Sequence, residues 1–296
     1  MNVLPKSKQA AILKALTEGA SVRATARMVG VSKTTVLKLL VEVGELCAIY
    51  HDKVVRNLPC KRIQMDEVWS FVAAKERHSR QAGHGDCWTY TAICADTKFV
   101  VSWFVGIRSL TNHIAFVRDA AGRIPGRIQL STDGNLMYMT AVEAGFGPNE
   151  IDYGMLIKRY EADREGEARY SLPRCTGIEK RSIFGQPDAK HISTSFVERS
   201  NLHLRMQSRR FTRLTNAFSR KVENHAHAVA LHFMVYNFCK SHGTLSKQNG
   251  GIHTSPAMAV GLTNHVWKVE ELVDMLDAET PIGGAARLAA NRNNPN

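Results

Sequence analysis

The sequence predicts an α/β protein in which an all-helical N-terminal domain precedes a domain built on a mixed β-sheet. Apolar residues among the first sixty positions recur at helical spacing, whereas from Arg62 onward they alternate with the period of strands. The change falls at "NLPCK", where Pro59 indicates a linker. The chain has 296 residues, enough for about two domains of the usual ~100–200 residues.

Composition narrows the classes of function. Lys plus Arg number 39 and Asp plus Glu 27, and the formal net charge of +12 favours nucleic acid or another anionic partner. The six cysteines include no Cys-x-x-Cys pair, which argues against a zinc ribbon and a secreted disulfide scaffold. Neither a signal-peptide core nor an apolar run of ~20 residues is present. We therefore expect a cytoplasmic protein without a membrane partner.

Three helices are predicted in residues 1–57, over "KSKQAAILKALTEG", "VRATARMV" and "KTTVLKLLVEVGELCAIYHDKVV". Ser21 and Ser32 are suitable N-caps for the second and third, and Gly30 tolerates the left-handed turn between them. Two helices joined by a short glycine turn are typical of the helix-turn-helix motif, although an ordinary three-helix bundle is the alternative. We assign residues 1–57 to a helix-turn-helix DNA-binding domain and 58–61 to a linker.

The start of the third predicted helix carries polar and basic side chains. In helix-turn-helix docking, the first turn of this helix enters the major groove and reaches phosphates and base edges. The residues that we expect to contact DNA are Lys33, Thr34, Thr35 and Lys38.

The predicted sheet begins with "RIQMDEVWSFVAA", in which apolar and more polar faces alternate. Asp66 lies on the more polar face, whereas Glu67 shares the mostly apolar face with Ile63 and Met65. If one acid of this strand takes part in chemistry, Asp66 is therefore the better candidate.

The remaining elements of the domain follow in order. Strands over "CWTYTAICAD" and "KFVVSWFVGIRS" meet in a hairpin, and "TNHIAFVRDAAGRI" is a helix. The strand "GRIQLSTDG" ends on Asp133, a short helix covers "MYMTAVEAG", and "IDYGMLIK" is the fifth strand. Residues 159–192 are polar and turn-rich and are interpreted as an insertion before the helix that carries Glu198.

The order of three strands, helix, strand, helix, strand and helix predicts an RNase H-like mixed sheet. With the first strand central and the fourth beside it, Asp66 and Asp133 become neighbours, and the last helix brings Glu198 against them. We assign residues 62–215 to this catalytic domain, residues 216–278 to a C-terminal helical region and residues 279–296 to a disordered tail.

Three acids in one place indicate a metal site, because like charges a few ångströms apart cannot all stay ionised without cations. Oxygen ligands without His or Cys suit Mg²⁺, with Mn²⁺ as a substitute, and two such ions ~3.5–4 Å apart serve phosphodiester displacement. Taken singly, each acid has an ordinary role as a turn, cap or helix-dipole residue. Asp152 and Glu143 compete as the third acid, but neither is followed by the basic face that follows Glu198.

The stretch "STSFVERSNLHLRMQSRRFTRLTNAFSRK" holds one acid, Glu198, and seven basic residues. On a helix, positions seven and eleven residues later fall on nearly the same face, and Asn201 lies close to it. The residues that we expect to bind phosphate or orient DNA are Asn201, Arg205, Arg209, Arg210 and Arg213. The alternative is that these arginines pair with acids of the insertion and only hold the fold.

Several of these motifs also resemble a known family. "MDEVWSFV", "STDG" followed by Tyr138, and "ERSNLHLR" followed by "RRFTRLT" and "FSRKVENH" resemble the DDE transposases of the IS-one family of bacterial insertion sequences. The resemblance covers roughly residues 62–240 and implies that Asp66, Asp133 and Glu198 are the catalytic acids. Two departures are the absence of a Cys-rich zinc finger and a longer interval between the second and third acids.

The resemblance implies a transposase that binds insertion-sequence ends in a bacterial or archaeal nucleoid. Hydrolysis at the element end would expose a 3′-hydroxyl, which would attack a target phosphodiester at the same site. The implied partners are double-stranded DNA, both terminal inverted repeats and target, and further copies of the chain in a dimer or higher oligomer. The alternatives are a helix-turn-helix regulator without catalysis and an RNase H-like nuclease.

The C-terminal region is predicted to begin with a long helix over "NAFSRKVENHAHAVALHFMVYNFCKSH". It carries His225, His227 and His232, which we interpret as packing residues because no acid stands between them as a base. The amphipathic segment "VWKVEELVDML" is predicted to be a short helix that serves dimer contact.

Overall fold

The computed structural model describes residues 4–79, 83–161, 175–212 and 217–277. Arg213, residues 162–174 of the predicted insertion and the predicted tail at 279–296 lie outside the described residues.

The chain begins with the three predicted helices. Ser21 and Ser32 act as the expected N-caps, since their hydroxyls accept hydrogen bonds from the backbone N–H groups of Ala24 and Thr35. Gly30 ends the second helix with a φ of 68°, which an L-residue with a side chain rarely adopts. The helices are α1 (Lys6–Thr17), α2 (Val22–Val29) and α3 (Lys33–Val54).

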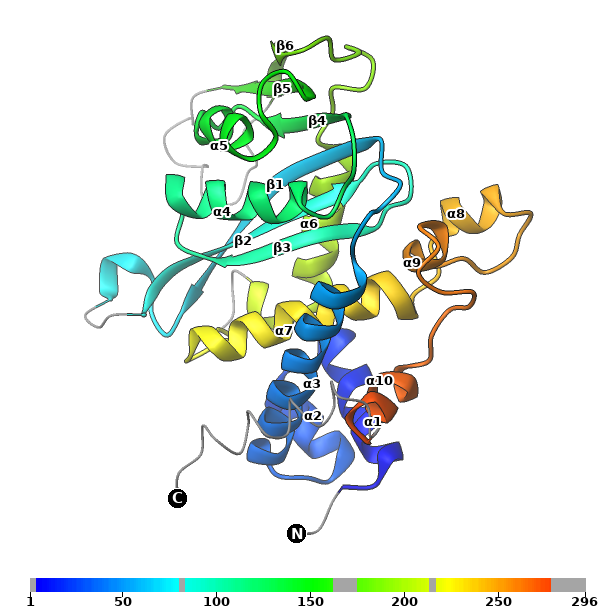
Figure 1. The fold of residues 1–296 in the computed structure, drawn as a ribbon. Coiled ribbons are helices and arrows are strands. Elements are labelled where there is room, and N and C mark those ends of the chain that lie inside the picture. Colours follow the sequence, from blue (N-terminus) through cyan, green and yellow to red (C-terminus); the bar gives the residue numbers. More distant parts are fainter. Residues whose placement is uncertain (1–3, 80–82, 162–174, 213–216, 278–296) are drawn as a thin grey trace.

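A six-stranded mixed sheet follows, in the order β3-β2-β1-β4-β5-β6 (Figure 1). The strands β1, β4 and β5 run parallel, while β2, β3 and β6 are antiparallel to their neighbours. The strands are β1 (Arg62–Val72), β2 (Gly85–Cys94), β3 (Val100–Gly106), β4 (Ile128–Asp133), β5 (Ile151–Tyr160) and β6 (Cys175–Phe184). The prediction of a central first strand with the fourth beside it is confirmed.

One strand was not predicted. The edge strand β6 lies inside the segment interpreted as an insertion, and its sequence "CTGIEKRSIF" is mostly exposed. It pairs with β5 on one side only and lies at the edge of the sheet. Because its side chains are mostly exposed, the sequence lacks the alternation of apolar and polar residues that indicates a strand.

Helices cover both faces of the sheet (Figure 1). Val68 of β1 packs with Val197, Leu204 and Phe233, which places α6 (Ser195–Gln207) and α7 (Val222–Met234) on the face of Asp66. The opposite face, which carries Glu67, is covered by α4 (Leu110–Ala121) and α5 (Met137–Phe146). The remaining elements are η1 (Glu76–His78), η2 (Arg209–Phe211), the π-helix η3 (Val235–Cys239), α8 (Gly243–Gln248), α9 (Pro256–Ala259) and α10 (Val269–Asp277).

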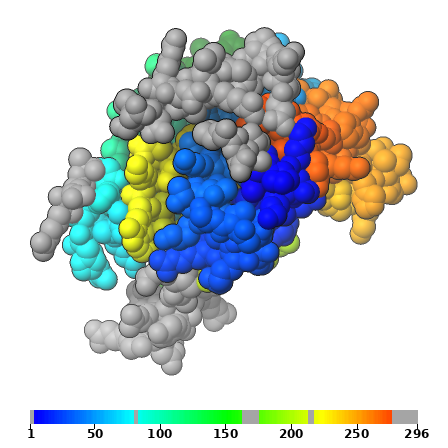
Figure 2. All heavy atoms as spheres, turned by 90° about the horizontal axis from the view of Figure 1, so that it is seen from below, coloured from blue at the N-terminus to red at the C-terminus, as the bar shows by residue number. Residues whose placement is uncertain are grey.

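The N-terminal helices pack directly on the C-terminal helices, as Figure 2 shows for the blue segment beside yellow α7. A Cβ added at Gly44 of α3 would lie 2.5 Å from Cβ of His227, so α3 and α7 touch at backbone distance. The buried residues of α1–α3 belong to the same hydrophobic cluster as those beneath α4 and α5. The boundaries at residues 57, 62 and 215 therefore stay predictions.

The helix α10 packs within its own chain. Leu272 and Val273 are fully buried, and Glu270 forms an ion pair of 2.6 Å with Lys14 of α1. The apolar face that was predicted to serve a dimer is thus covered by α1 and α3. Over the described residues, none of the helices combines the length and apolar character that crossing a lipid bilayer requires.

Candidate metal and DNA site

The candidate site lies where β1 and β4 separate. Their parallel pairing ends at Gln64 and Ser131, and Asp66 and Asp133 each follow two residues later. Beyond that point β1 keeps β2 as its partner and β4 keeps β5. The two carboxylates therefore face an opening at the carboxyl ends of parallel strands, a common position for ligand sites in α/β proteins.

Three acids converge at this opening. Asp66, Glu67 and Asp133 each offer a carboxylate oxygen, and these three atoms lie within 4.8 Å of one another. Burial, together with the nearby charges of Asp133 and Glu67, raises the pKa of Asp66 to about 7. Burial also raises the pKa of Asp133. Without a cation the group therefore resists full ionisation at neutral pH.

Glu67 is the member that sequence reasoning passed over. Its buried Oε1 lies 2.6 Å from Nε2 of His113, accepts a hydrogen bond of 2.9 Å from Asn135 Nδ2 and lies 3.4 Å from Arg108 Nε. His113 Nδ1 faces the backbone oxygen of Ser109 at 2.8 Å. Both imidazole nitrogens thus face oxygen atoms, which holds the ring of His113 between Glu67 and the backbone at the start of α4. The signal was an acid on an apolar strand face, where burial requires a partner.

The helix α6 is anchored to β1 beside this group. Gln64 Oε1 accepts hydrogen bonds from the backbone nitrogens of Phe196 and Val197, at 2.8 and 3.1 Å, and so caps the helix N-terminus. Asn201 Nδ2, further along α6, donates a hydrogen bond of 2.9 Å to Asp66 Oδ2. Asn201 therefore orients the central carboxylate.

Glu198 lies near the three acids but is not a member of the group. Its Oε1 pairs with Lys158 Nζ of β5 and accepts a hydrogen bond of 2.6 Å from Thr194 Oγ1. Its charge contributes to the raised pKa of Asp66. The role of Glu198 as third metal ligand stays a prediction. Lys158 was also passed over, although it follows by two residues Leu156, the partner of Asp133 in the sheet.

Several buried polar atoms beside the acids lack a hydrogen-bond partner among the described residues. They include the hydroxyl of Tyr138, whose pKa is raised well above 10 by burial and by the charges of Glu67 and Asp66, and Oδ1 of Asn201. Leaving such atoms unpaired is costly, and the water shell of a hydrated divalent cation supplies donors and acceptors. The oxygen-only donor set and these two atoms therefore fit Mg²⁺ or Mn²⁺.

The predicted DNA-contacting residues of α3 lie at its start. Lys33, Thr34 and Lys38 are exposed, whereas the hydroxyl of Thr35 is within 2.9 Å of the Ser32 hydroxyl. Thr35 thus contributes to the N-cap as well as to the outer surface.

The basic residues that follow α6 lie in different surroundings. Arg205 lies on α6, Arg209 is exposed on η2, and Arg210 is partly buried with its Nε donating to Ser219 Oγ at 2.7 Å. Within the described part of the chain, no ion pair joins Arg209 or Arg210 to an acid, Glu161 of the predicted insertion included. The competing acid Asp152 pairs with Arg127 at 2.7 Å and accepts from the Gln186 backbone.

The histidines of α7 behave as packing residues. His225 and His232 are buried, and burial lowers the pKa of each to about 3, with the charge of Arg210 adding to the effect at His225. Both rings are therefore neutral at physiological pH.

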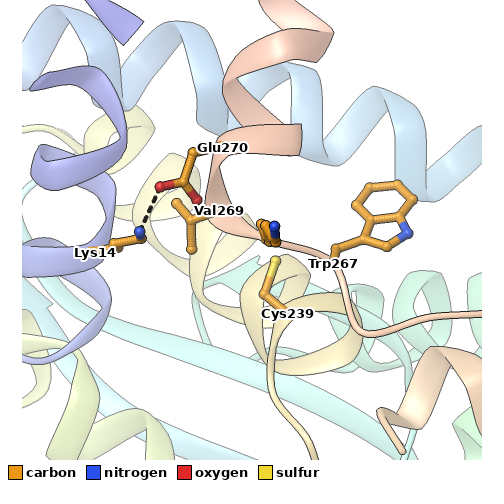
Figure 3. A pocket seen from close by; sticks show the side chains of 6 residues that line it. Lys14, Cys239, Trp267, Val269 and Glu270 are labelled. Carbon is orange, nitrogen blue, oxygen red and sulfur yellow. Dashed lines mark hydrogen bonds and ion pairs between the residues drawn. The ribbon is translucent and has the colours of Figure 1, made fainter. Parts of the chain in front are cut away.

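A separate pocket of about 630 Å³ lies between α1, η3 and α10 (Figure 3). Lys14 and Glu270 form an ion pair at its edge, and Cys239 and Trp267 line it. Burial raises the pKa of the Cys239 thiol to about 12, so this sulfur is not an activated nucleophile. None of the three acids lines this pocket.

No protein-family model matches the chain, and a search of curated proteins finds no significant match.

Proposed function

We propose that the chain is a DNA transposase that cleaves and joins phosphodiesters at the acidic group between β1 and β4. The observation that carries the proposal is the convergence of Asp66, Glu67 and Asp133 in an oxygen-only set on a strongly basic chain. The sheet order with a central β1, and helices on both faces, supports an RNase H-like catalytic domain. The capped turn between α2 and α3 supports helix-turn-helix recognition of DNA ends.

In the proposed mechanism, the acids would hold two cations. Asp66, Glu67 and Asp133 would hold one divalent ion, and Asp66 with Glu198 would hold a second once Glu198 turns away from Lys158. Two Mg²⁺ or Mn²⁺ ions, when bound, activate the attacking oxygen and stabilise the leaving oxygen of an in-line displacement.

The protein's own contribution is to orient these groups. His113 and Asn135 fix the Glu67 carboxylate, and Asn201 fixes that of Asp66. Lys158 neutralises Glu198 and, once released, offers an ammonium to a DNA phosphate. Such fixed geometry lets one site serve first hydrolysis and then attack by the exposed 3′-hydroxyl. The proposed partners are terminal inverted repeats, target DNA and further copies of the chain.

The test is incubation of the full chain and Mg²⁺ with DNA that carries the inverted repeats flanking its own gene. We expect cleavage at the repeat ends and joined products, both lost in the presence of EDTA. Cleavage without joining or end preference would favour a simple nuclease. Specific binding without cleavage in either Mg²⁺ or Mn²⁺ would favour a regulator and contradict the proposal.

A further inference from the structure

A cleft of about 910 Å³ is lined by the N-terminal helices on one side and by the end of α6 and α7 on the other. One wall comes from the α1–α2 turn and the first turns of α3, and includes Lys33 and Thr34. The other comes from η2, the residues before α7 and α7 itself. At Gly19 (φ +85°) an added Cβ would lie 2.8 Å from the backbone oxygen of Met206, so the turn closes on the end of α6.

The cleft is charged with one sign only. Among the described residues, its lining includes the cations Arg23, Lys33, Arg209, Arg210 and Arg220, and no Asp or Glu. Within the described part of the chain, none of these five side chains forms an ion pair. Concave surfaces lined by one sign of charge focus the electrostatic field and concentrate ions of the opposite sign. The missing counter-charge therefore points to an anionic ligand.

Arg210 is held in a fixed position in the cleft by a hydrogen bond. Its Nε donates to Ser219 Oγ, and its terminal nitrogens have no partner among the described residues. Burial lowers the pKa of this guanidinium to about 10, so the side chain stays a cation at neutral pH. Four N–H donors of a partly buried cation are thus left for a ligand, in the fork geometry that matches phosphate.

A chain of hydrogen bonds fixes Arg210 to the central strand. Ser219 Oγ lies 3.5 Å from Nδ1 of His225, and Nε2 of His225 lies 3.1 Å from Ser70 Oγ. Ser70 donates to the backbone oxygen of Cys87 at 2.8 Å, which sets the direction of the chain. Because His225 is neutral, it accepts from Ser219 and donates to Ser70. Ser70 shares its strand and face with Asp66, so the strand that bears the acid also supports Arg210.

We propose that this cleft binds the phosphodiester backbone of DNA whose neighbouring segment reaches the acidic group. From Asn201, which contacts Asp66, to Gln207, which lines the cleft, α6 rises about 9 Å. That distance is about three backbone steps of ~3.4 Å. The cleft therefore joins end recognition by α3 to the acids in one continuous DNA path. The inference takes DNA as the ligand from the proposed function but does not depend on catalysis.

The test measures binding of the full chain to a short fluorescent duplex of unrelated sequence, by anisotropy, between about 50 and 200 mM salt. Arg209→Ala and Arg210→Ala should each weaken binding and lower the slope of log K against log salt by about 1. The matched control is Arg118→Ala, which removes the same charge from α4 on the opposite face of the sheet. Arg209 and Lys33 are exposed, so their variants keep the test valid if Arg210→Ala unfolds.

Wild-type salt slopes in Arg209→Ala, Arg210→Ala and Lys33→Ala would overturn the cleft assignment while leaving the proposed catalysis intact. Reduced slopes in a protein that never cleaves DNA would uphold the cleft and contradict the proposed function. Complete displacement of DNA by millimolar inorganic phosphate at constant ionic strength would indicate a free-phosphate site instead. A wild-type chain that binds no DNA would overturn both assignments.

Discussion

The acidic opening between β1 and β4 and the basic cleft beside α3 carry opposite charge. The strand β1 contributes to both, because it bears Asp66 and, through Ser70, supports Arg210. At the opening, Asp66 and its neighbours are crowded like charges whose ionisation burial opposes. In the cleft, Arg210 is a partly buried cation that pairs with no acid among the described residues. Each region gathers charge of one sign. Under the proposed function, a divalent cation at the acids and a DNA phosphate in the cleft would supply the opposite charge.

The largest expected effect is a loss of DNA cleavage without a change in DNA binding when one of the acids is replaced. Asp66→Ala and Asp133→Ala should each lower the cleavage rate by more than about a hundredfold, because loss of a ligand exceeds the 10–100-fold cost of losing a supporting contact. The salt slope of DNA binding should stay at its wild-type value, since neither acid lines the cleft. Cleavage assays and anisotropy on the same preparations check both statements. Retained cleavage in either variant would remove that residue from the site.

The two regions should also respond oppositely to pH. The folded-state pKa of His225 is lowered to about 3, so its unfolded form binds more protons below pH 6.5 and stability is lost as pH falls. At pH 5 this costs about 2 kcal/mol. The raised pKa of Asp66, about 7, has the other sign, because stability is lost as pH rises between about 4 and 7.

Metal-free denaturant unfolding between pH 5 and 7 checks this contrast. His225→Asn should weaken the loss of stability toward pH 5, and Asp66→Asn should weaken the loss toward pH 7. Identical pH profiles for the wild type and both variants would show that neither environment is as the structure describes.

The sequence predicted the arrangement of the strands better than it predicted the contacts between side chains. Apolar alternation and the placement of Asp133 at a strand end were sufficient to make Asp66 and Asp133 neighbours. The edge strand β6 was not predicted, because its exposed side chains show no alternation of buried and exposed positions. Glu67 was not selected as a site residue, because its partner, His113, lies 46 residues away on another element.

The cleft is a still clearer case of what sequence patterns leave out. Arg210 was predicted as one of several basic residues, but its setting depends on Ser219, His225 and Ser70, and Ser70 lies 155 residues from His225. Hydrogen bonds over such separations follow from tertiary packing of β1 against α7, which residue periodicity does not encode.

A smaller effect concerns Lys158 of β5, which pairs with Glu198 near the acidic group. Lys158→Met removes the ammonium that holds Glu198, so Mn²⁺ should bind about fivefold more tightly, the equivalent of ~1 kcal/mol for a partly exposed ion pair. Titration calorimetry of the full chain measures this change. Lys180→Met, a change on β6 outside the acidic group, is the matched control and should leave the affinity unaltered. Weaker binding in Lys158→Met would mean that Lys158 supports the metal site.

Divalent-ion binding tests the central claim most directly. Titration of the metal-free chain with Mn²⁺, followed by electron paramagnetic resonance, should show bound ions that excess Mg²⁺ displaces. Asp133→Asn keeps the shape of the side chain but removes its charge, and should weaken Mn²⁺ binding at least about tenfold. A wild-type chain that binds no Mn²⁺, or an Asp133→Asn variant that binds it equally well, would contradict the assignment of Asp66, Glu67 and Asp133 as a metal site.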